Sequence, residues 1–255
     1  MTGHTAGPAG FTGVAPVAPR PAADLAPLLA WLRTGQVPHG RMDFTAGTAV
    51  PDGRLDLCKQ ALGPEGAAAV AEALRPGPVR HLLLGTDGLG DEGARTLAAA
   101  LATAPYGRLR RLSVASNGIG PGAVATLVGA AAAAGVEVCD LGRVRAAGAL
   151  GARDNHVDEE AAAAIGAVPA ERPHRMTHLV LSHTGMRSRE AHRLLDAAPR
   201  AAAPTRYLLG KGIATSVRRR LDAFSARPPP LPPVPAVPAD VAAIRSLHRQ
   251  PPPAP

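Results

Sequence analysis

The sequence predicts an α/β solenoid, a stack of similar units in which short parallel strands alternate with alanine-rich helices. Three observations predict it. A short phrase of the type leucine, any residue, leucine recurs at residues 55, 82, 112, 139 and 179, in steps of 27, 30, 27 and 40 residues. A polar residue and then an apolar one follow these phrases, and alanine-rich segments with helical spacing come next. Periods in this range are typical of stacked supersecondary units, none of which can bury its apolar side alone.

The recurring phrases are expected to be strands whose two outer residues anchor the core. They are Leu55-Asp56-Leu57, Leu82-Leu83-Leu84, Leu112-Ser113-Val114, Cys139-Asp140-Leu141 and Leu179-Val180-Leu181. Because side chains alternate along a strand, the residues between and before these anchors should point to the opposite, concave surface. In the fourth unit about 11 extra residues precede Asn155 and Val157, where the pattern resumes, so a loop insertion is expected within residues 142–154.

Each strand phrase is followed by a polar residue and then by a helical segment. The polar residues are expected to hydrogen-bond the backbone of a stacked turn: Gln60, Asp87, Asn117 and Thr184. The helical segments include GPEGAAAVAEAL, GDEGARTLAAAL, GPGAVATLVGAA and DEEAAAAIGAV. One equivalent helical position is always apolar and should face the sheet: Val70, Leu97, Leu127, Ile165 and Leu194.

The phrases GAAAVAEAL and GARTLAAAL resemble those of leucine-rich-repeat proteins of the ribonuclease-inhibitor-like type, and in particular the bacterial gala-type repeats. The resemblance covers about residues 54–198. It implies a curved parallel sheet inside, helices outside, and a role in protein–protein interaction rather than catalysis. The usual asparagine is present only at Asn117 and Asn155, so inhibition of a ribonuclease stays an alternative function rather than the main expectation. A similarity to Ran GTPase-activating solenoids adds a further class, a regulator of an enzyme.

Four segments are expected along the chain. Residues 1–21 lack periodicity and should be disordered. Residues 22–53 should hold a capping helix, with leucines at helical spacing over residues 22–33, and a short strand near Met42 and Phe44. Residues 54–224 should form the repeat array, which ends in a degenerate repeat around Tyr207 and Ile213. Residues 225–255 form a proline-rich tail that cannot build a core.

Charge and cysteine usage restrict the function classes. Residues 1–199 contain 19 Lys and Arg against 18 Asp and Glu, whereas residues 200–255 contain 9 against 2, so the array itself is close to neutral. Since recognition motifs and stacking aromatics are missing as well, a nucleic-acid partner is not expected. The two cysteines, Cys58 and Cys139, are expected to be free thiols of a reducing compartment. Without a signal peptide or a membrane-length apolar run, a cytoplasmic protein with no membrane contact is expected.

The residues that the strands turn to the concave surface form the candidate site. The first row is basic in four of five units, with Arg54, His81, Arg111 and His178 around Val138. The next row contains Asp56, Ser113 and Asp140, and a third row is uniformly small. Like charges on neighbouring strands destabilise a sheet, so an acidic protein segment is the expected partner. The alternative is that these residues are simply solvated at the strand starts.

Other chemistries fit poorly. Ser113, Asp140 and His178 suggest a serine hydrolase triad, but Ser113 and His178 would lie two strands, or about 10 Å, apart. The nine histidines and two cysteines give no metal-ligand set, and the glycines near residue 142 lack P-loop spacing, so neither metal nor cofactor is expected. In the tail, Arg227, Pro230 and Pro233 match the pattern of proline-rich docking peptides, with a stiff linker as the alternative.

Overall fold

The computed structural model describes residues 18–74, 78–105, 107–145, 147–171, 174–201 and 203–225 of the chain. Its strands are β1 (Met42–Phe44), β2 (Gly47–Ala49), β3 (Arg54–Asp56), β4 (His81–Leu83), β5 (Arg111–Ser113), β6 (Val138–Asp140), β7 (His178–Leu181) and β8 (Arg206–Leu209). Its α-helices are α1 (Ala22–Thr34), α2 (Gly63–Ala73), α3 (Gly90–Thr103), α4 (Pro121–Ala133), α5 (Glu159–Glu171), α6 (Ser188–Ala197) and α7 (Thr215–Phe224).

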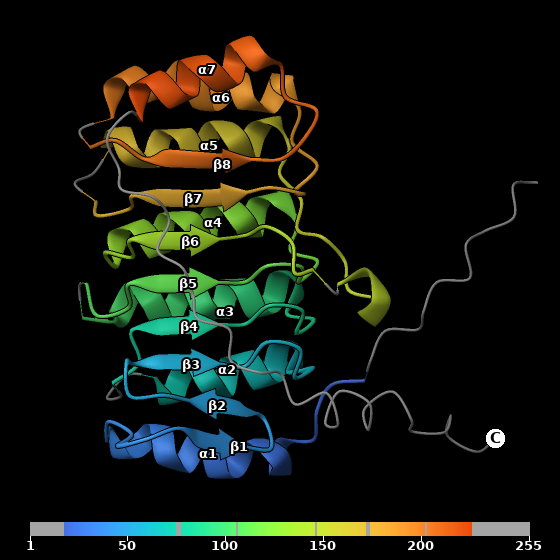
Figure 1. Ribbon diagram of the computed structural model, residues 1–255, viewed down its shortest axis with the longest axis vertical. Coiled ribbons are helices and arrows are strands. Elements are labelled where there is room, and N and C mark those ends of the chain that lie inside the picture. The colour runs from blue at the N-terminus through green and yellow to red at the C-terminus, as the bar shows by residue number, and fades with distance from the viewer. Residues whose placement is uncertain are drawn as a thin grey trace, which may run out of the picture.

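The strands form one sheet in the order of the sequence, β1 to β8. The pairs from β3 to β8 are parallel, whereas β1, β2 and β3 pair antiparallel. Figure 1 shows the units stacked along the long axis, with the helices behind the strands and every strand from β3 to β8 running in one direction. This alternation of strand and helix in a mostly parallel sheet agrees with the predicted α/β stack. We call the sheet face turned away from these helices the open face, and the edge where β3 to β8 begin, at the left of Figure 1, the strand-entry edge.

The predicted anchors align in register across the sheet. Leu55 is paired with Leu82, Leu82 with Leu112, Leu112 with Cys139 and Cys139 with Leu179. All of these side chains are buried, as are the second anchors and the apolar helix positions. Each helix from α2 to α6 packs on the next, and alanine on the contacting faces permits this close approach. The core is therefore one continuous layer between sheet and helices.

Helices lie at both ends of the array. The helix predicted over residues 22–33 is α1, which buries Leu25, Leu28 and Leu32 and packs against α2. Trp31 lies beside Phe44 of β1, with ring centroids 5.6 Å apart. The short strand predicted near Met42 is correct, but it belongs to a hairpin with β2 that the sequence did not indicate. At the other end, α7 packs on α6 and β8.

A ladder of buried amides ties the turns of successive units together. Asn117 Oδ1 accepts hydrogen bonds from the N–H groups of Asp87 (2.8 Å) and Leu89 (3.3 Å), and its Nδ2 donates to the Leu84 carbonyl (2.6 Å). Asn155 repeats the arrangement one unit later, bonding the N–H groups of Asn117 (3.1 Å) and Ile119 (3.0 Å). Its Nδ2 donates to two further carbonyls, each at 2.9 Å. The polar position of the sequence pattern thus fixes the spacing of the stack.

The predicted backbone bonding was wrong at the two ends of this ladder. Thr184 Oγ1 donates to the Leu181 carbonyl within its own turn (2.8 Å), because a hydroxyl is too short to reach the preceding unit. Gln60 lies in the first unit, and the described residues contain no earlier repeat turn for it to bond. Its side-chain amide donates to the Cys58 carbonyl (3.3 Å), and its Oε1 accepts a bond from Arg20 (2.8 Å). Arg20 thereby joins the segment before α1 to the first turn.

Candidate functional site

Three of the four basic residues predicted for the concave surface lie on neighbouring strands of the sheet, and His178 lies two strands beyond Arg111. Arg54 is in register with His81, His81 with Arg111, and Val138 with His178 on the strands that follow. We call Arg54, His81, Arg111 and His178 the basic row. Arg206 of β8 is in register with His178 and extends the row by one strand. Arg206 was not predicted as part of this row. The alignment of the repeats within the sequence relied on the leucine phrase, which the last unit lacks.

Burial differs strongly along the basic row. Arg54 exposes 8% of its surface and His178 exposes none, whereas His81, Arg111 and Arg206 are half-buried. The Arg54 guanidinium group forms an ion pair with Asp52 (3.4 Å), and His178 Nδ1 shares a hydrogen bond with Thr177 Oγ1 (2.9 Å). Of the four residues of the basic row, His81 and Arg111 are therefore the two that keep substantial exposed surface. Both lie near the centre of the open face.

The pKa of His81 is sensitive to burial and to the positive charges around it. Burial lowers this pKa below 6.5, and Arg111, Arg110 and Arg54 lower it further, while Asp52 acts in the opposite direction. Burial also lowers the pKa of Arg111, and Asp140 partly offsets the effect. An anion held against this row would relieve the repulsion and favour the protonated imidazole.

The three polar residues of the second row form hydrogen bonds within the chain. Ser113 Oγ donates to Asp140 Oδ2 (3.1 Å), and the Gly142 N–H donates to Asp140 Oδ1 (2.9 Å). Asp56 Oδ1 accepts a bond from the Cys58 N–H (3.0 Å). Ser113 is buried, whereas Asp56 and Asp140 are half-buried. Since the serine hydroxyl bonds a carboxylate and His178 lies two strands away, the geometry does not assemble the hydrolase triad.

Gly85 belongs to the third row of the open face, the row of small residues. The loop after β6 covers part of this row. A Cβ atom added at Gly85 would lie 2.7 Å from Cγ2 of Val144, so Val144 packs directly over this glycine. The Val144 N–H donates to Ser116 Oγ (3.0 Å), and Arg143 forms an ion pair with Asp154 (3.3 Å). The loop expected within residues 142–154 is thus closed onto the open face, and it contains a short 3₁₀ turn at Gly148–Leu150. It forms the projection at the right of Figure 1.

Replacing Gly85 by valine is expected to displace Val144 and open this loop. Trypsin should then cleave after Arg143, Arg145 or Arg153 about tenfold faster, because a local opening made about 1.4 kcal/mol easier raises its population tenfold. Limited proteolysis followed by mass spectrometry measures the rates. Gly122→Val on α4 is the matched control, since a Cβ added there has no described atom within 4 Å. Equal cleavage of the two variants would show that Val144 does not hold the loop.

Both thiols are raised in pKa by burial and by neighbouring carboxylates. Burial, together with the carboxylates of Asp56 and Asp87, raises the pKa of Cys58 well above 9.0. Burial and Asp140 raise the pKa of Cys139 to about 12. Cys139 is a core residue, and Cys58 Sγ accepts a hydrogen bond from the Gly85 N–H (3.3 Å). A thiol that remains protonated is a poor nucleophile and a poor metal ligand.

Within the described ranges, no group of three or more His, Cys, Asp or Glu side chains is arranged to hold a metal ion. In the same part of the chain, no helix is both long and apolar enough to cross a membrane. The proposed docking residues Arg227, Pro230 and Pro233 lie outside the described residues. The described candidate site is therefore the open face with its basic row and the Ser113–Asp140 pair.

No protein-family model and no curated protein matches the chain, so the comparisons with known proteins assign neither a family nor a function.

Proposed function

We propose that this chain is a leucine-rich-repeat protein of the ribonuclease-inhibitor-like type, most similar to gala-type repeats, that binds an acidic segment of a partner protein on the open face of its sheet. The observation that carries the proposal is the register of Arg54, His81 and Arg111 on three neighbouring strands. The role is a non-catalytic one in the cytoplasm. It uses no metal, no cofactor, no nucleic acid and no membrane surface.

The arrangement of charge supports an acidic rather than a neutral partner. Residues in register on neighbouring parallel strands are about 4.8 Å apart, so a protonated His81 would be repelled by Arg111 on the next strand. A carboxylate between them would form charge-assisted hydrogen bonds, which are about twice as strong as neutral ones. Burial is the main cause of the lowered pKa of His81, and the neighbouring arginines lower it further against the opposing effect of Asp52, so a bound carboxylate would favour the protonated imidazole.

The leucine-rich-repeat assignment rests on the position of the amide ladder as well as on the leucine phrases. Asn117 and Asn155 each accept two backbone N–H bonds and donate to backbone carbonyls of adjacent turns. Such a side chain satisfies buried backbone groups that a short strand leaves unpaired. An array whose turns are pinned in this way presents a rigid strand face, which lowers the entropic cost of binding a partner.

Charge reversal at Arg111 is expected to weaken binding of an acidic peptide about tenfold, because a hydrogen bond to a charged group contributes about 1.5–3 kcal/mol. The probe is a labelled peptide of alternating glutamate and serine, and fluorescence anisotropy measures its affinity for the full chain. Arg219→Glu on α7 is the matched control, since Arg219 is exposed on the last helix and the net charge changes equally.

A peptide of alternating lysine and serine tests the sign of the interaction. The proposal requires that the acidic peptide bind and the basic one not, and that affinity fall as salt is added. If Arg111→Glu and Arg219→Glu weaken the acidic peptide equally, net charge rather than the basic row is responsible, and the proposed site is wrong.

A further inference from the structure

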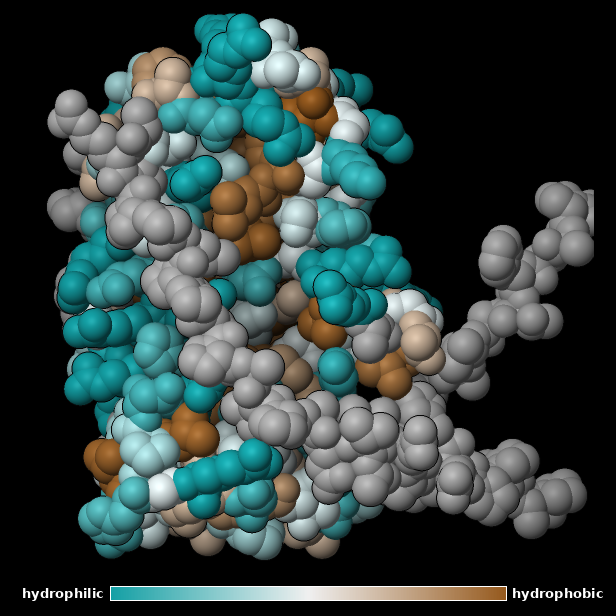
Figure 2. Space-filling model, in the orientation of Figure 1, coloured by the Kyte–Doolittle hydropathy of each residue, from teal (hydrophilic) through white to brown (hydrophobic). Residues whose placement is uncertain are grey.

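A second feature of the array lies beside the basic row, at the strand-entry edge. The loops that lead into β4 and β5 carry arginines at Arg80, Arg108 and Arg110, and Arg175 stands in the loop before β7. The Arg110 N–H donates to the Arg80 carbonyl (2.7 Å), so these two residues occupy equivalent places on neighbouring units. Figure 2 shows hydrophilic residues gathered along this edge, at the left of the view.

The charge at this edge is incompletely balanced by the described residues. Asp52 forms an ion pair with Arg54, and Glu137 forms one with Arg175 at 2.9 Å. Arg80 and Arg110 are exposed, and neither has a carboxylate within 4 Å in the described part of the chain. Two guanidinium groups on adjacent units repel one another, and a carboxylate of a partner placed between them would remove that repulsion.

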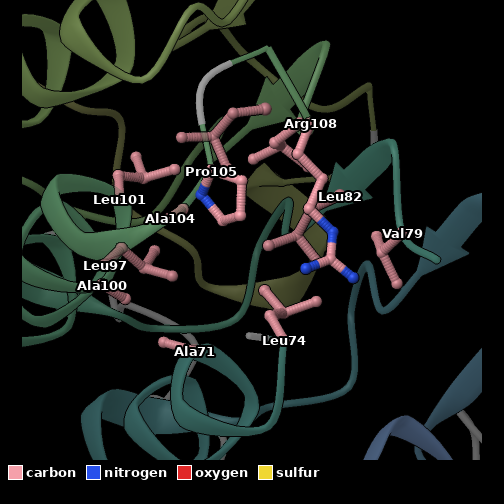
Figure 3. A pocket seen from close by; sticks show the side chains of 12 residues that line it. Ala71, Leu74, Val79, Leu82, Leu97, Ala100, Leu101, Ala104, Pro105 and Arg108 are labelled. Atoms are coloured by element: carbon pink, nitrogen blue, oxygen red, sulfur yellow. The ribbon is translucent and has the colours of Figure 1, made fainter. Parts of the chain in front are cut away.

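Beside these arginines lies an apolar cavity between α2 and α3. Its volume is about 50 Å³, and its walls are formed mainly by leucines and alanines of both helices and of the following loops. Val79 and Leu109, the neighbours of Arg80 and Arg110 in the sequence, both line it. In Figure 3 the Arg108 side chain extends from the loop before β5 into this group of apolar side chains. The cavity and the exposed cations therefore belong to the same two loops.

The size of the cavity restricts what it can hold. A dry cavity of about 150 Å³ accommodates benzene, whereas one water needs about 10–15 Å³ of such volume. A volume of about 50 Å³ thus admits the branched end of one aliphatic side chain but no aromatic ring. Water gains little there, because the described lining is almost wholly apolar and Arg108 is the one charged residue among the described lining residues.

We propose that the partner's acidic segment carries one aliphatic residue, a leucine or an isoleucine, that anchors in this cavity while flanking carboxylates pair with Arg80 and Arg110. The proposal rests on the proposed function and extends it, since it names an anchor and a second contact area next to the basic row. A side chain that fills a desolvated pocket, with surrounding contacts that exclude water from it, can contribute a large share of the binding energy of an interface.

The test compares two acidic peptides on the full chain, identical except for a central leucine or alanine. The leucine peptide should bind about tenfold tighter, the value for burying roughly two methylene groups. Ala104→Leu places a larger side chain at the cavity wall and should abolish this preference. Ala163→Leu, an exposed position on α5, is the matched control and should retain it. Arg110→Glu should weaken both peptides by a similar factor.

Each alternative result is informative. Equal binding of the two peptides to the wild-type chain, or a leucine preference that survives Ala104→Leu, overturns the anchor while leaving the proposed function intact. Failure of both peptides to bind overturns the proposed function. Should Ala104→Leu not fold, Ala100→Leu in the same wall replaces it. A dimer in sedimentation equilibrium that Ala104→Leu dissociates would place a second copy in the cavity, and would also overturn the proposal.

Discussion

Replacing Asn155 by alanine is expected to lower the free energy of unfolding by about 3–4 kcal/mol. The side chain is buried and makes four hydrogen bonds, two accepted from backbone N–H groups and two donated to carbonyls. Removing it leaves these buried backbone groups unpaired, at about 1–3 kcal/mol for each group that water does not reach. Asn155 bonds the turn of its own unit and that of the preceding unit. Removing its hydrogen bonds therefore weakens the packing between these two units.

Urea unfolding followed by far-ultraviolet circular dichroism measures this change. Thr126→Ala is the control, since the Thr126 hydroxyl bonds the Gly122 carbonyl on the exposed side of α4, and surface substitutions usually stay within about 0.5 kcal/mol. A loss below about 1 kcal/mol for Asn155→Ala would contradict the role given to the ladder. Asn155→Asp separates acceptance from donation, because an ionised carboxylate accepts the two N–H bonds but cannot donate to the carbonyls.

Replacing Asp87 by asparagine is expected to stabilise the protein at neutral pH by about 1–3 kcal/mol. Asp87 occupies the ladder position that asparagine fills in the next two units, and its Oδ1 accepts the Gln60 N–H (2.7 Å). Its Oδ2 is buried without a hydrogen-bond partner among the described residues. An asparagine Nδ2 at this place should donate to the Leu57 carbonyl, as that of Asn117 does to the equivalent Leu84 carbonyl.

The same substitution should remove a pH dependence. Burial raises the pKa of Asp87 well above 3.8, with a further contribution from Asp56, so the native state holds this proton more tightly than the unfolded chain. The stability that the proton supplies is fully present below about pH 3.8 and is lost as the pH rises through the raised native pKa. The advantage of the asparagine variant should therefore grow from mildly acidic to neutral pH.

Urea unfolding of both proteins across this pH range checks the prediction. Asp222→Asn, at an exposed position on α7, controls for the removal of one negative charge. A difference between Asp87→Asn and the wild-type chain that stays constant with pH would show that Asp87 titrates normally. If Asp87→Asn were less stable than the wild-type chain at neutral pH, a carboxylate rather than an amide would be the favoured group at this position of the ladder.

The sequence by itself determined the order of the units and the residues that build the core. Strand and helix periodicity are local properties, so Leu82 and Leu112 could be assigned to the inner face and Val70 and Leu97 to the sheet-facing helix positions without any knowledge of the fold. The polar position of each turn was also evident, because a buried backbone must be hydrogen-bonded.

Only the tertiary structure decided which side chains of the open face are available and what lies next to them. Residues that alternate in the same way differ in burial, as His178 and Arg111 show, because burial depends on neighbours from distant units. Val144 reaches Gly85 across about two units, and Arg206 joins the basic row through strand pairing alone. The cavity beside Arg80 and Arg110 is lined by residues of both α2 and α3, so it is a property of two surfaces in contact that no single segment encodes.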